Sequence, residues 1–333
     1  FFKGLAGQTM IYGLGTIVPR LINYLLLTPF YTRIFTKAQY GTVSELYAYS
    51  SLLLVLLIHG METTYFRYSV DKKEEPNTFN HAVFSTSVFA TAFLLIALIF
   101  KQDIAELIRY EQNVNYIVCF AFIIFFDVIT SIPFARMRNQ NRALKFSIIK
   151  LINVSVNILL NIFFFVVCRD SENELLASFY NPDINIGYAF ISNMVASTVT
   201  FLLVLPEYRS FRFNISLRKY LTMLNYTWPL IVIGIAGVIN EVSDKIFLKY
   251  LSDGSLVAEE QVGIYAANYK IAVLMTIFIQ MFNYAAEPFF FKKSLAKDAK
   301  ESYSVVMDYF VIFCLLIFLM VPMYIAIFKY FIG

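Results

Sequence analysis

Long apolar segments, separated by short polar connections, follow one another along the whole chain. Each is long enough to cross a bilayer, for which an α-helix needs about 20 mostly apolar residues. The apolar runs are continuous and do not alternate with polar positions, so they predict helices and not the strands of a membrane barrel. The pattern predicts nine spans, at residues 5–31, 42–68, 79–100, 114–135, 146–168, 184–205, 218–250, 262–289 and 303–332.

Composition supports this pattern. Of 333 residues, 59% are hydrophobic and only 15% are charged, whereas a soluble domain carries about 25% charged residues. The aromatic content of 18% is typical of chains whose rings face lipid and mark its two interfaces. We therefore predict an all-α polytopic membrane protein. The net charge of +4 is spread over the connections and does not indicate a nucleic-acid partner.

The charges of the connections predict an orientation. Lys and Arg gather in three of them, at residues 136–145, 209–219 and 292–300, whereas Asp and Glu mark residues 170–174 and 253–260. Because Lys and Arg accumulate on the cytoplasmic side of membrane proteins, we expect the N-terminus to be cytoplasmic.

A short sequence repeat links two parts of the chain. Gln39-Tyr40-Gly41 opens the second span, and Gln261-Val262-Gly263 opens the eighth, 222 positions later. The same offset carries Gly15 in the first span onto Gly237 in the seventh. Glycine- or proline-interrupted spans at matching positions of two halves are a feature of transporters that are built from repeats. An offset of six helices preserves orientation, so it predicts two parallel lobes.

The predicted lobes are residues 1–206, with six helices, and residues 207–333, with three. The second lobe is therefore expected to be incomplete and the natural protein to continue, although a nine-helix protein is the alternative. We expect the seventh span to be interrupted at Pro229 and Gly234, and the first at Gly15 and Pro19.

Arg20 places a fixed charge inside the first span. An arginine at mid-depth costs at least about 2.5–3.5 kcal/mol on insertion scales, so it should face protein or a water-filled cavity. We therefore expect the first helix to line such a cavity.

The fifth span carries a polar stripe, Lys150, Asn153, Asn157 and Asn161. Steps of three and four residues keep these side chains on one helix face. An amide ladder of this kind can bond sugar hydroxyls in a wet cavity. Alternatively it holds helices together, at about 0.6 kcal/mol per hydrogen bond.

Intramembrane acids are candidates for cation coupling. Asp127 lies well inside the fourth span. In the second span Glu62 shares a predicted face with His59, which suits a proton relay, or it pairs with Arg67 to close an inner gate. Both interpretations remain open.

The seventh span carries a further acid, Asp244. Its neighbours Glu241 and Lys245 have the spacing of a favourable i, i+4 pair, which would leave Asp244 without a partner. Lys270 lies in the eighth span, toward the outer side.

Several chemistries have no motif in the sequence. No GxxxxGK[ST] phosphate loop occurs, and neither HExxH nor CxxC is present. With two His and three widely spaced Cys, we predict no metal site and no catalytic residues, and therefore no enzyme.

Two segments carry a family resemblance. The sequence TRIFTKAQYG at 32–41 follows a Gly- and Arg-containing first helix, and Glu260 to Tyr265 lie between Asp244 and Lys270. Together they resemble polysaccharide flippases of the Wzx type, which share a superfamily with the multidrug MATE transporters. The resemblance implies two six-helix lobes and alternating access. It also implies a cationic cavity for an undecaprenyl-diphosphate-linked oligosaccharide in the bacterial inner membrane.

On this basis we assign roles to the candidate residues. Arg20, Lys150 and Lys270 would attract the diphosphate. Asn153, Asn157 and Asn161 would contact the sugars, and Glu62, Asp127 or Asp244 would bind a coupling H⁺ or Na⁺. No other cofactor is expected. The partners would be the lipid-linked oligosaccharide, membrane lipids and other polysaccharide-assembly proteins.

Two other functions remain as alternatives. A drug/cation antiporter of the MATE type would favour an acidic, apolar cavity over a cationic, amide-rich one. A membrane-embedded glycosyltransferase or polymerase should have large catalytic loops, and the connections here are short.

Overall fold

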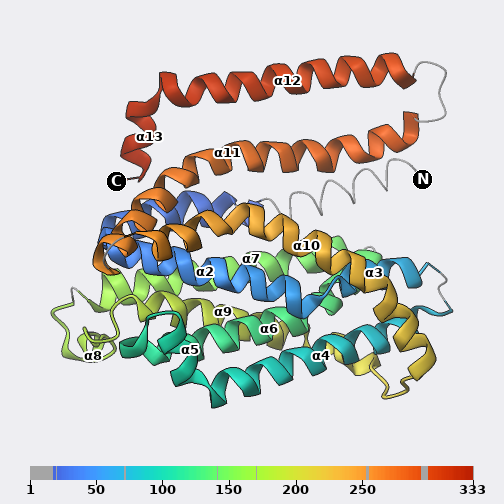
Figure 1. The fold of residues 1–333 in the computed structure, drawn as a ribbon, viewed down its shortest axis with the longest axis horizontal. Coiled ribbons are helices and arrows are strands. Elements are labelled where there is room, and N and C mark those ends of the chain that lie inside the picture. Colours follow the sequence, from blue (N-terminus) through green and yellow to red (C-terminus); the bar gives the residue numbers. More distant parts are fainter. Residues whose placement is uncertain are drawn as a thin grey trace.

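A computed structural model of the chain describes residues 18–19, 21–70, 73–140, 142–169, 171–252, 255–293 and 299–332. Within these ranges every regular element is helical, and most of the long helices run along the long axis of the molecule (Figure 1). Eight segments in this part of the chain are long and apolar enough to cross a membrane: Lys37–Tyr68, Glu75–Ile99, Glu111–Asn139, Ala143–Cys168, Gly187–Ser210, Leu217–Leu251, Val257–Ile279 and Lys300–Met323. The predicted all-α membrane fold is therefore confirmed. About half of the first predicted span lies outside the described residues, and helix follows at residues 21–34.

The helices follow one another with few interruptions. In chain order they are α2 (Lys37–Ile58), α3 (Met61–Tyr68), α4 (Glu75–Ile99), α5 (Lys101–Leu107), η1 (Glu111–Asn113), α6 (Val114–Asn139), α7 (Ala143–Ile162), η2 (Phe163–Cys168), α8 (Glu174–Ala177), α9 (Gly187–Val204), η3 (Leu205–Ser210), α10 (Leu217–Leu251), α11 (Ser255–Lys293), α12 (Ala299–Met323) and α13 (Ile325–Ile332). We call the helices up to α9 the N-terminal bundle and α10 to α13 the C-terminal helices.

The second predicted span is broken in two. α2 begins with a capping box, in which the Thr36 side chain accepts from the backbone N–H of Gln39 and the Gln39 side chain accepts from that of Thr36. It ends where His59 and Gly60 take positive φ angles of 41° and 67°, a left-handed conformation that cannot continue a helix. His59 and Glu62 therefore lie on different helices, and the predicted shared face was wrong. His59 instead contacts Ser85 Oγ through Nε2, at 2.8 Å.

α6 is the central helix of the N-terminal bundle. It packs against α4 on one side and α9 on the other, and Val128, Ile132 and Ala135 on it are completely buried. Its charged side chains have partners on neighbouring helices: Asp127 accepts from Ser197 Oγ on α9, and Arg138 pairs with Glu62 on α3. Most of the rest of the helix is apolar, which suits its central place.

The seventh predicted span is one uninterrupted helix, α10, and the expected break was wrong. Pro229 lies inside it, and only one backbone donor is lost there because proline lacks an N–H group. Contacts with α2 and the α2–α3 junction support this region: Gly234 lies against Val55, and Gly60 lies against Leu230.

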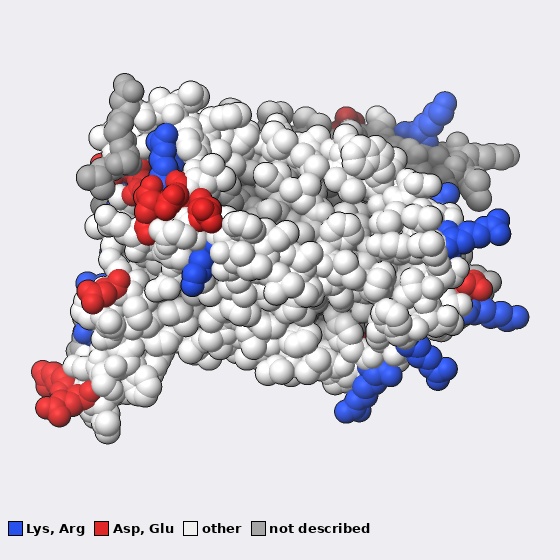
Figure 2. Space-filling model, turned by 60° about the horizontal axis from the view of Figure 1, so that its bottom comes forward, with Lys and Arg blue, Asp and Glu red and all other residues white. Residues whose placement is uncertain are grey.

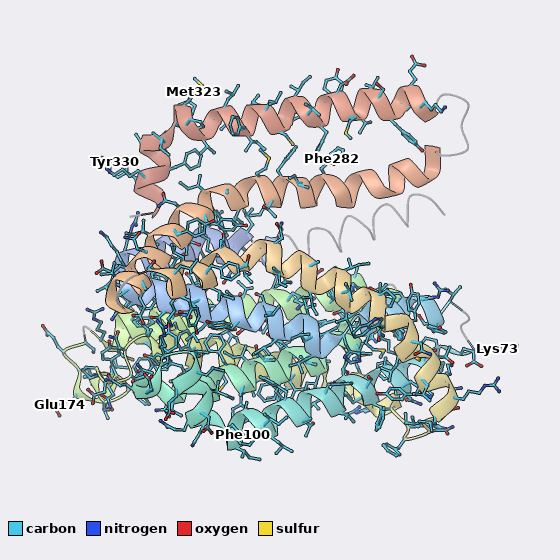
Figure 3. The ribbon with its side chains drawn as sticks, viewed as in Figure 1. Lys73, Phe100, Glu174, Phe282, Met323 and Tyr330 are labelled. Carbon is cyan, nitrogen blue, oxygen red and sulfur yellow. The ribbon has the colours of Figure 1, made fainter. Side chains whose placement is uncertain are left out.

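α11 connects the bundle to the end of the chain. Its first part lies beside α2, and the ribbon then bends, so that its second part and α12 stand away from the other helices (Figure 1). The side chains of α12 project from both sides of that helix (Figure 3), and many of its large apolar residues are exposed in the described chain.

Charge differs between the two ends of the molecule. On the face shown in Figure 2, most Lys and Arg side chains gather at one end and most Asp and Glu at the other. Figure 3 marks these ends by Lys73, in the α3–α4 connection, and Glu174, at the start of α8. We call them the basic end and the acidic end.

Candidate functional site

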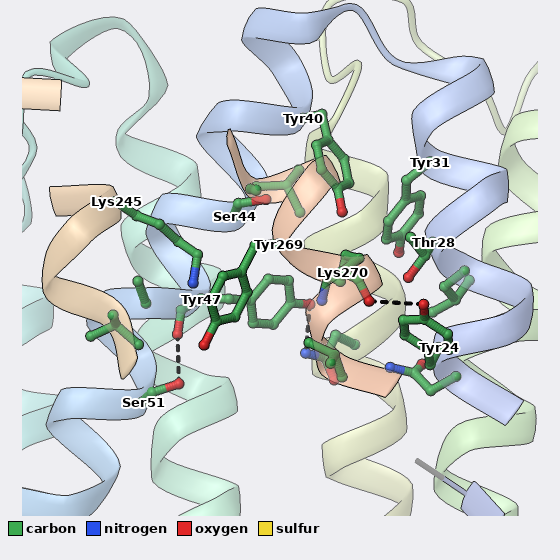
Figure 4. A pocket seen from close by; sticks show the side chains of 18 of the residues that line it. Tyr24, Thr28, Tyr31, Tyr40, Ser44, Tyr47, Ser51, Lys245, Tyr269 and Lys270 are labelled. Atoms are coloured by element: carbon green, nitrogen blue, oxygen red, sulfur yellow. Dashed lines mark hydrogen bonds between the residues drawn. The ribbon is translucent and has the colours of Figure 1, made fainter. Parts of the chain in front are cut away.

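A polar cavity of about 470 Å³ lies where the N-terminal bundle meets α10 and α11. Its walls come from the helix at residues 21–34 and from α2, α7, α9, α10 and α11. In Figure 4, Tyr47 and Tyr269 lie at its centre, with Lys245 on one side and Lys270 and Tyr24 on the other. Helices from both parts of the chain therefore contribute to a single site.

Five tyrosines give this cavity its character: Tyr24, Tyr31, Tyr40, Tyr47 and Tyr269. Three have partners that hold their hydroxyl groups. Tyr24 donates to Lys270 O at 2.8 Å, Tyr31 donates to Asn161 Oδ1 at 2.8 Å, and Tyr47 accepts from Asn193 Nδ2 at 2.8 Å. The rings are thus fixed in place, and each offers an apolar face beside a polar edge.

The sequence analysis did not identify these tyrosines, although a signal was present. Tyr24 and Tyr31 are seven residues apart, as are Tyr40 and Tyr47. Seven residues are close to two helical turns, so each pair lies on one face of its helix. The high overall content of Tyr and Phe concealed this spacing.

The polar stripe on α7 divides at the cavity. Asn153 and Asn157 line it, and Asn153 Nδ2 also donates to Thr200 Oγ1 on α9, at 2.8 Å. Asn161 is completely buried, accepts from Tyr31 and donates to Asn157 Oδ1 at 3.0 Å. Asn161 therefore orients two residues of the cavity from behind.

The predicted cationic residues also lie in different places. Lys270 lines the cavity together with Lys245, whose ammonium is 4.5 Å from the ring centroid of Tyr269. Lys150 does not line it, and its ammonium lies 4.2 Å from the ring centroid of Phe134. Arg20 lies outside the described residues.

Glu241 is the only carboxylate among the described residues that line the cavity. No ion pair joins it to Lys245 in the described part of the chain, although both side chains line the same space. The i, i+4 pair expected from the sequence was therefore wrong. Both charges remain directed at the cavity, where they can meet a ligand.

The three acids predicted to bind a coupling cation lie outside the cavity wall. Asp127 accepts from Ser197 Oγ at 2.9 Å, and Asp244 accepts from the hydroxyl of Tyr265 on α11. Glu62 forms an ion pair with Arg138.

The alternative Glu62–Arg67 pair is not formed. The guanidinium of Arg67 instead lies 4.3 Å from the ring centroid of Tyr226 on α10. Glu62 and Arg67 are both on α3 but five positions apart, a spacing that places them on different faces of the helix.

A bundle of apolar helices around a polar cavity defines the class of the protein as a polytopic helical membrane protein. The sequence model of the family described as "Polysaccharide biosynthesis protein" matches residues 5–294. The chain therefore belongs to this family.

The comparison of structures gives the same class of fold. The chain is similar to a multidrug resistance transporter of the MATE family, in the MOP superfamily, solved in an outward-facing conformation. The TM-score is 0.61 at 14% sequence identity, and the match covers 96% of this chain and 71% of that one. No curated protein sequence matches the chain significantly.

Proposed function

We propose that this protein is a flippase that carries an undecaprenyl-diphosphate-linked oligosaccharide across the bacterial cytoplasmic membrane, for the assembly of a surface polysaccharide. The observation that carries the proposal is the cavity lined by fixed tyrosine rings and amides. Family membership supports it, because the family is described by polysaccharide biosynthesis.

The chemistry of the cavity suits both parts of such a substrate. Sugar rings present C–H faces that can pack on aromatic faces, and hydroxyls that can bond amides such as Asn153 and Asn157. A diphosphate carries concentrated negative charge, which ammonium groups attract as point charges and a guanidinium binds through two parallel hydrogen bonds. Lys245 and Lys270 would supply the first kind of contact, and Arg20 the second.

Alternating access driven by H⁺ or Na⁺ is part of the proposal. Asp244 is the best placed of the predicted acids, because it precedes Lys245 on α10 and accepts from Tyr265 on α11. Glu62 is already held by Arg138, and Asp127 lies within the N-terminal bundle.

The orientation is tested by labelling from one side of the membrane. In a background without native cysteines, a Lys73→Cys variant should react with an impermeant maleimide only from the cytoplasm, and Glu174→Cys only from outside. The physical reason is the accumulation of Lys and Arg at the end that carries Lys73. Labelling of both cysteines from the same side would contradict the assignment.

Transport is tested in vesicles that contain a labelled undecaprenyl-diphosphate oligosaccharide. Asn157→Leu removes an amide from the cavity wall, and it should slow translocation by about tenfold or more, as when a site that bonds a hydroxyl loses its partner. Asn268→Leu is the matched control, because this exposed amide on α11 donates only to Ile264 O in its own helix. Equal translocation by both variants at equal abundance would refute the sugar-contact role.

Drug/cation antiport is the second candidate. The cavity carboxylate of Glu241 could bind an organic cation, and the structurally similar protein is a multidrug transporter. The same vesicles distinguish the two functions. Efflux of a lipophilic cation without movement of the labelled oligosaccharide would favour antiport.

A further inference from the structure

The most deeply buried ion pair in the described chain joins the N-terminal bundle to α10. Lys249 Nζ lies 2.9 Å from Glu45 Oε2, and the side chains are 2% and 1% exposed. Tyr110 donates to the same carboxylate oxygen at 2.6 Å, and Lys249 donates to Ile108 O at 2.9 Å. The second oxygen, Glu45 Oε1, is buried without a hydrogen-bond partner. One oxygen of the Glu45 carboxylate is therefore unsatisfied in this arrangement. Because the pair joins α2 to α10, separation of these helices would break it.

One helical turn away, α2 and α11 touch through two glycines. A Cβ atom on Gly41 would overlap the carbonyl oxygen of Glu259, and one on Gly263 would overlap that of Lys37. These contacts are reciprocal, because each glycine meets the residue four positions before the other. Backbone meets backbone here, which only glycine permits.

These glycines are the ones that the repeated segments Gln39–Gly41 and Gln261–Gly263 share. The two copies of the repeat thus contact each other across a local pseudo-twofold relation. The sequence signal therefore marks a contact between the two parts of the chain.

The same segment of α2 separates two cavities. Tyr40, Val43 and Ser44 line the central cavity, whereas Gln39 and Thr42 line a second, polar cavity of about 850 Å³. The second cavity is bounded by residues 109–113 and 183–186 and by Glu259, and it lies toward the acidic end. Separation of α2 from α10 and α11 would therefore join the two spaces.

We propose that this contact is the outer gate of the transport path, closed by the reciprocal glycines and locked by the Glu45–Lys249 pair. The inference rests on the proposed transport function for its purpose, but its geometry is independent of any substrate. Opening requires α10 to take Lys249 away from Glu45, which breaks the buried ion pair. Neutralising one of them removes the attraction that holds the gate shut.

The experiment measures access to the central cavity from outside. In the full chain with Cys119, Cys168 and Cys314 replaced by Ala, Ser51→Cys places a thiol in the cavity wall. Intact cells or right-side-out vesicles are treated with an impermeant maleimide. Glu45→Gln and Lys249→Met should each raise the labelling rate by about tenfold, the shift expected when a two-state equilibrium loses part of its bias.

Gly41→Ala tests the gate without altering a charge. The added methyl group meets backbone on α11, so the helices must move apart and labelling should also rise. Gly237→Ala is the matched control, because a Cβ there meets nothing within 4 Å. Lys219→Met is the control for the loss of a lysine, since its partner Glu74 lies at the basic end.

Labelling of Gly41→Ala at the rate of Gly237→Ala, in protein of equal abundance, would overturn the gate. So would labelling of the parent as fast as a cysteine at Glu174 on the surface. A closed gate in a protein that moves no oligosaccharide would refute the proposed function and leave the gate intact. Translocation of the oligosaccharide by a protein whose cavity is already labelled at the surface rate would refute the gate and leave the proposed function.

Discussion

Among the described residues, two ion pairs connect the N-terminal bundle to α10. One lies near each end of that helix, and one pair is buried while the other is exposed. Glu45 and Lys249 are almost completely buried, whereas Glu74 and Lys219 retain 52% and 25% of their side-chain exposure. The N···O distances are 2.9 Å and 2.6 Å, so distance does not distinguish them. Burial does, because water replaces a lost partner at the surface and cannot do so inside.

The helices around the buried pair are also packed more closely than α11 is toward the basic end. Near Glu45, α2 and α11 are in backbone contact, and Lys249 Nζ lies 3.8 Å from the ring centroid of Tyr110. Toward the basic end α11 bends away from the bundle (Figure 1). α11 is therefore in close contact with α2 at the acidic end and apart from the bundle toward the basic end.

The largest expected effect comes from breaking the buried pair. Lys249→Met leaves the Glu45 carboxylate without its partner, and removing one member of a buried pair costs about 3–5 kcal/mol. We expect a loss of this order in the free energy of unfolding, measured by denaturant titration in detergent. The double variant Glu45→Leu with Lys249→Met should recover most of it. A double variant as unstable as the single one would show that the pair does not act as a unit.

Much of the fold could be predicted from the sequence, because hydropathy over about 20 residues reports directly on the bilayer. What failed was the local backbone. The left-handed pair His59 and Gly60 breaks the second span, while Pro229 leaves the seventh unbroken. Both outcomes depend on whether neighbouring helices satisfy the freed backbone groups. Hydropathy averaged over about 20 residues carries no information about such contacts.

The site was harder to predict than the fold. Intramembrane charges such as Lys150 and Asp127 were visible in the sequence, but which helix face meets the cavity depends on packing between helices. Glu45 and Lys249 were overlooked because they are more than 200 positions apart and have no local motif. The repeated glycines were noticed as a repeat, and only the structure brings them into contact.

An intermediate effect is expected at the junction of α2 and α3. Gly60 has φ of +67°, and a Cβ there would lie 2.7 Å from Leu230 Cβ. Gly60→Ala should therefore destabilise the protein by about 1–3 kcal/mol, from backbone strain and overlap. Gly237→Ala should instead stabilise it, by up to about 1 kcal/mol, because an exposed helical glycine gains propensity as alanine. Thermal unfolding should show a lower Tm for Gly60→Ala and a higher Tm for Gly237→Ala. A lower Tm for Gly237→Ala would contradict the open surroundings of that residue.

The smallest effect is expected at the exposed pair. The Lys219 ammonium hydrogen-bonds to Glu74 and holds the pKa of that carboxyl below its ordinary value of 4.5. Because this pKa is lower in the folded protein than in the unfolded one, the pair stabilises the fold at pH values above 4.5. This stabilisation is lost as the pH falls through the folded pKa. Lys219→Ala should therefore lower Tm slightly at pH 7, and the deficit should disappear at a pH low enough to protonate Glu74 in the folded protein. Added salt should also remove the difference at pH 7, because it screens exposed charges, whereas the deficit of Lys249→Met should persist. A Lys219→Ala deficit that resists both acid and salt would mean that the basic end is held as firmly as the acidic end, and the contrast between them would fail.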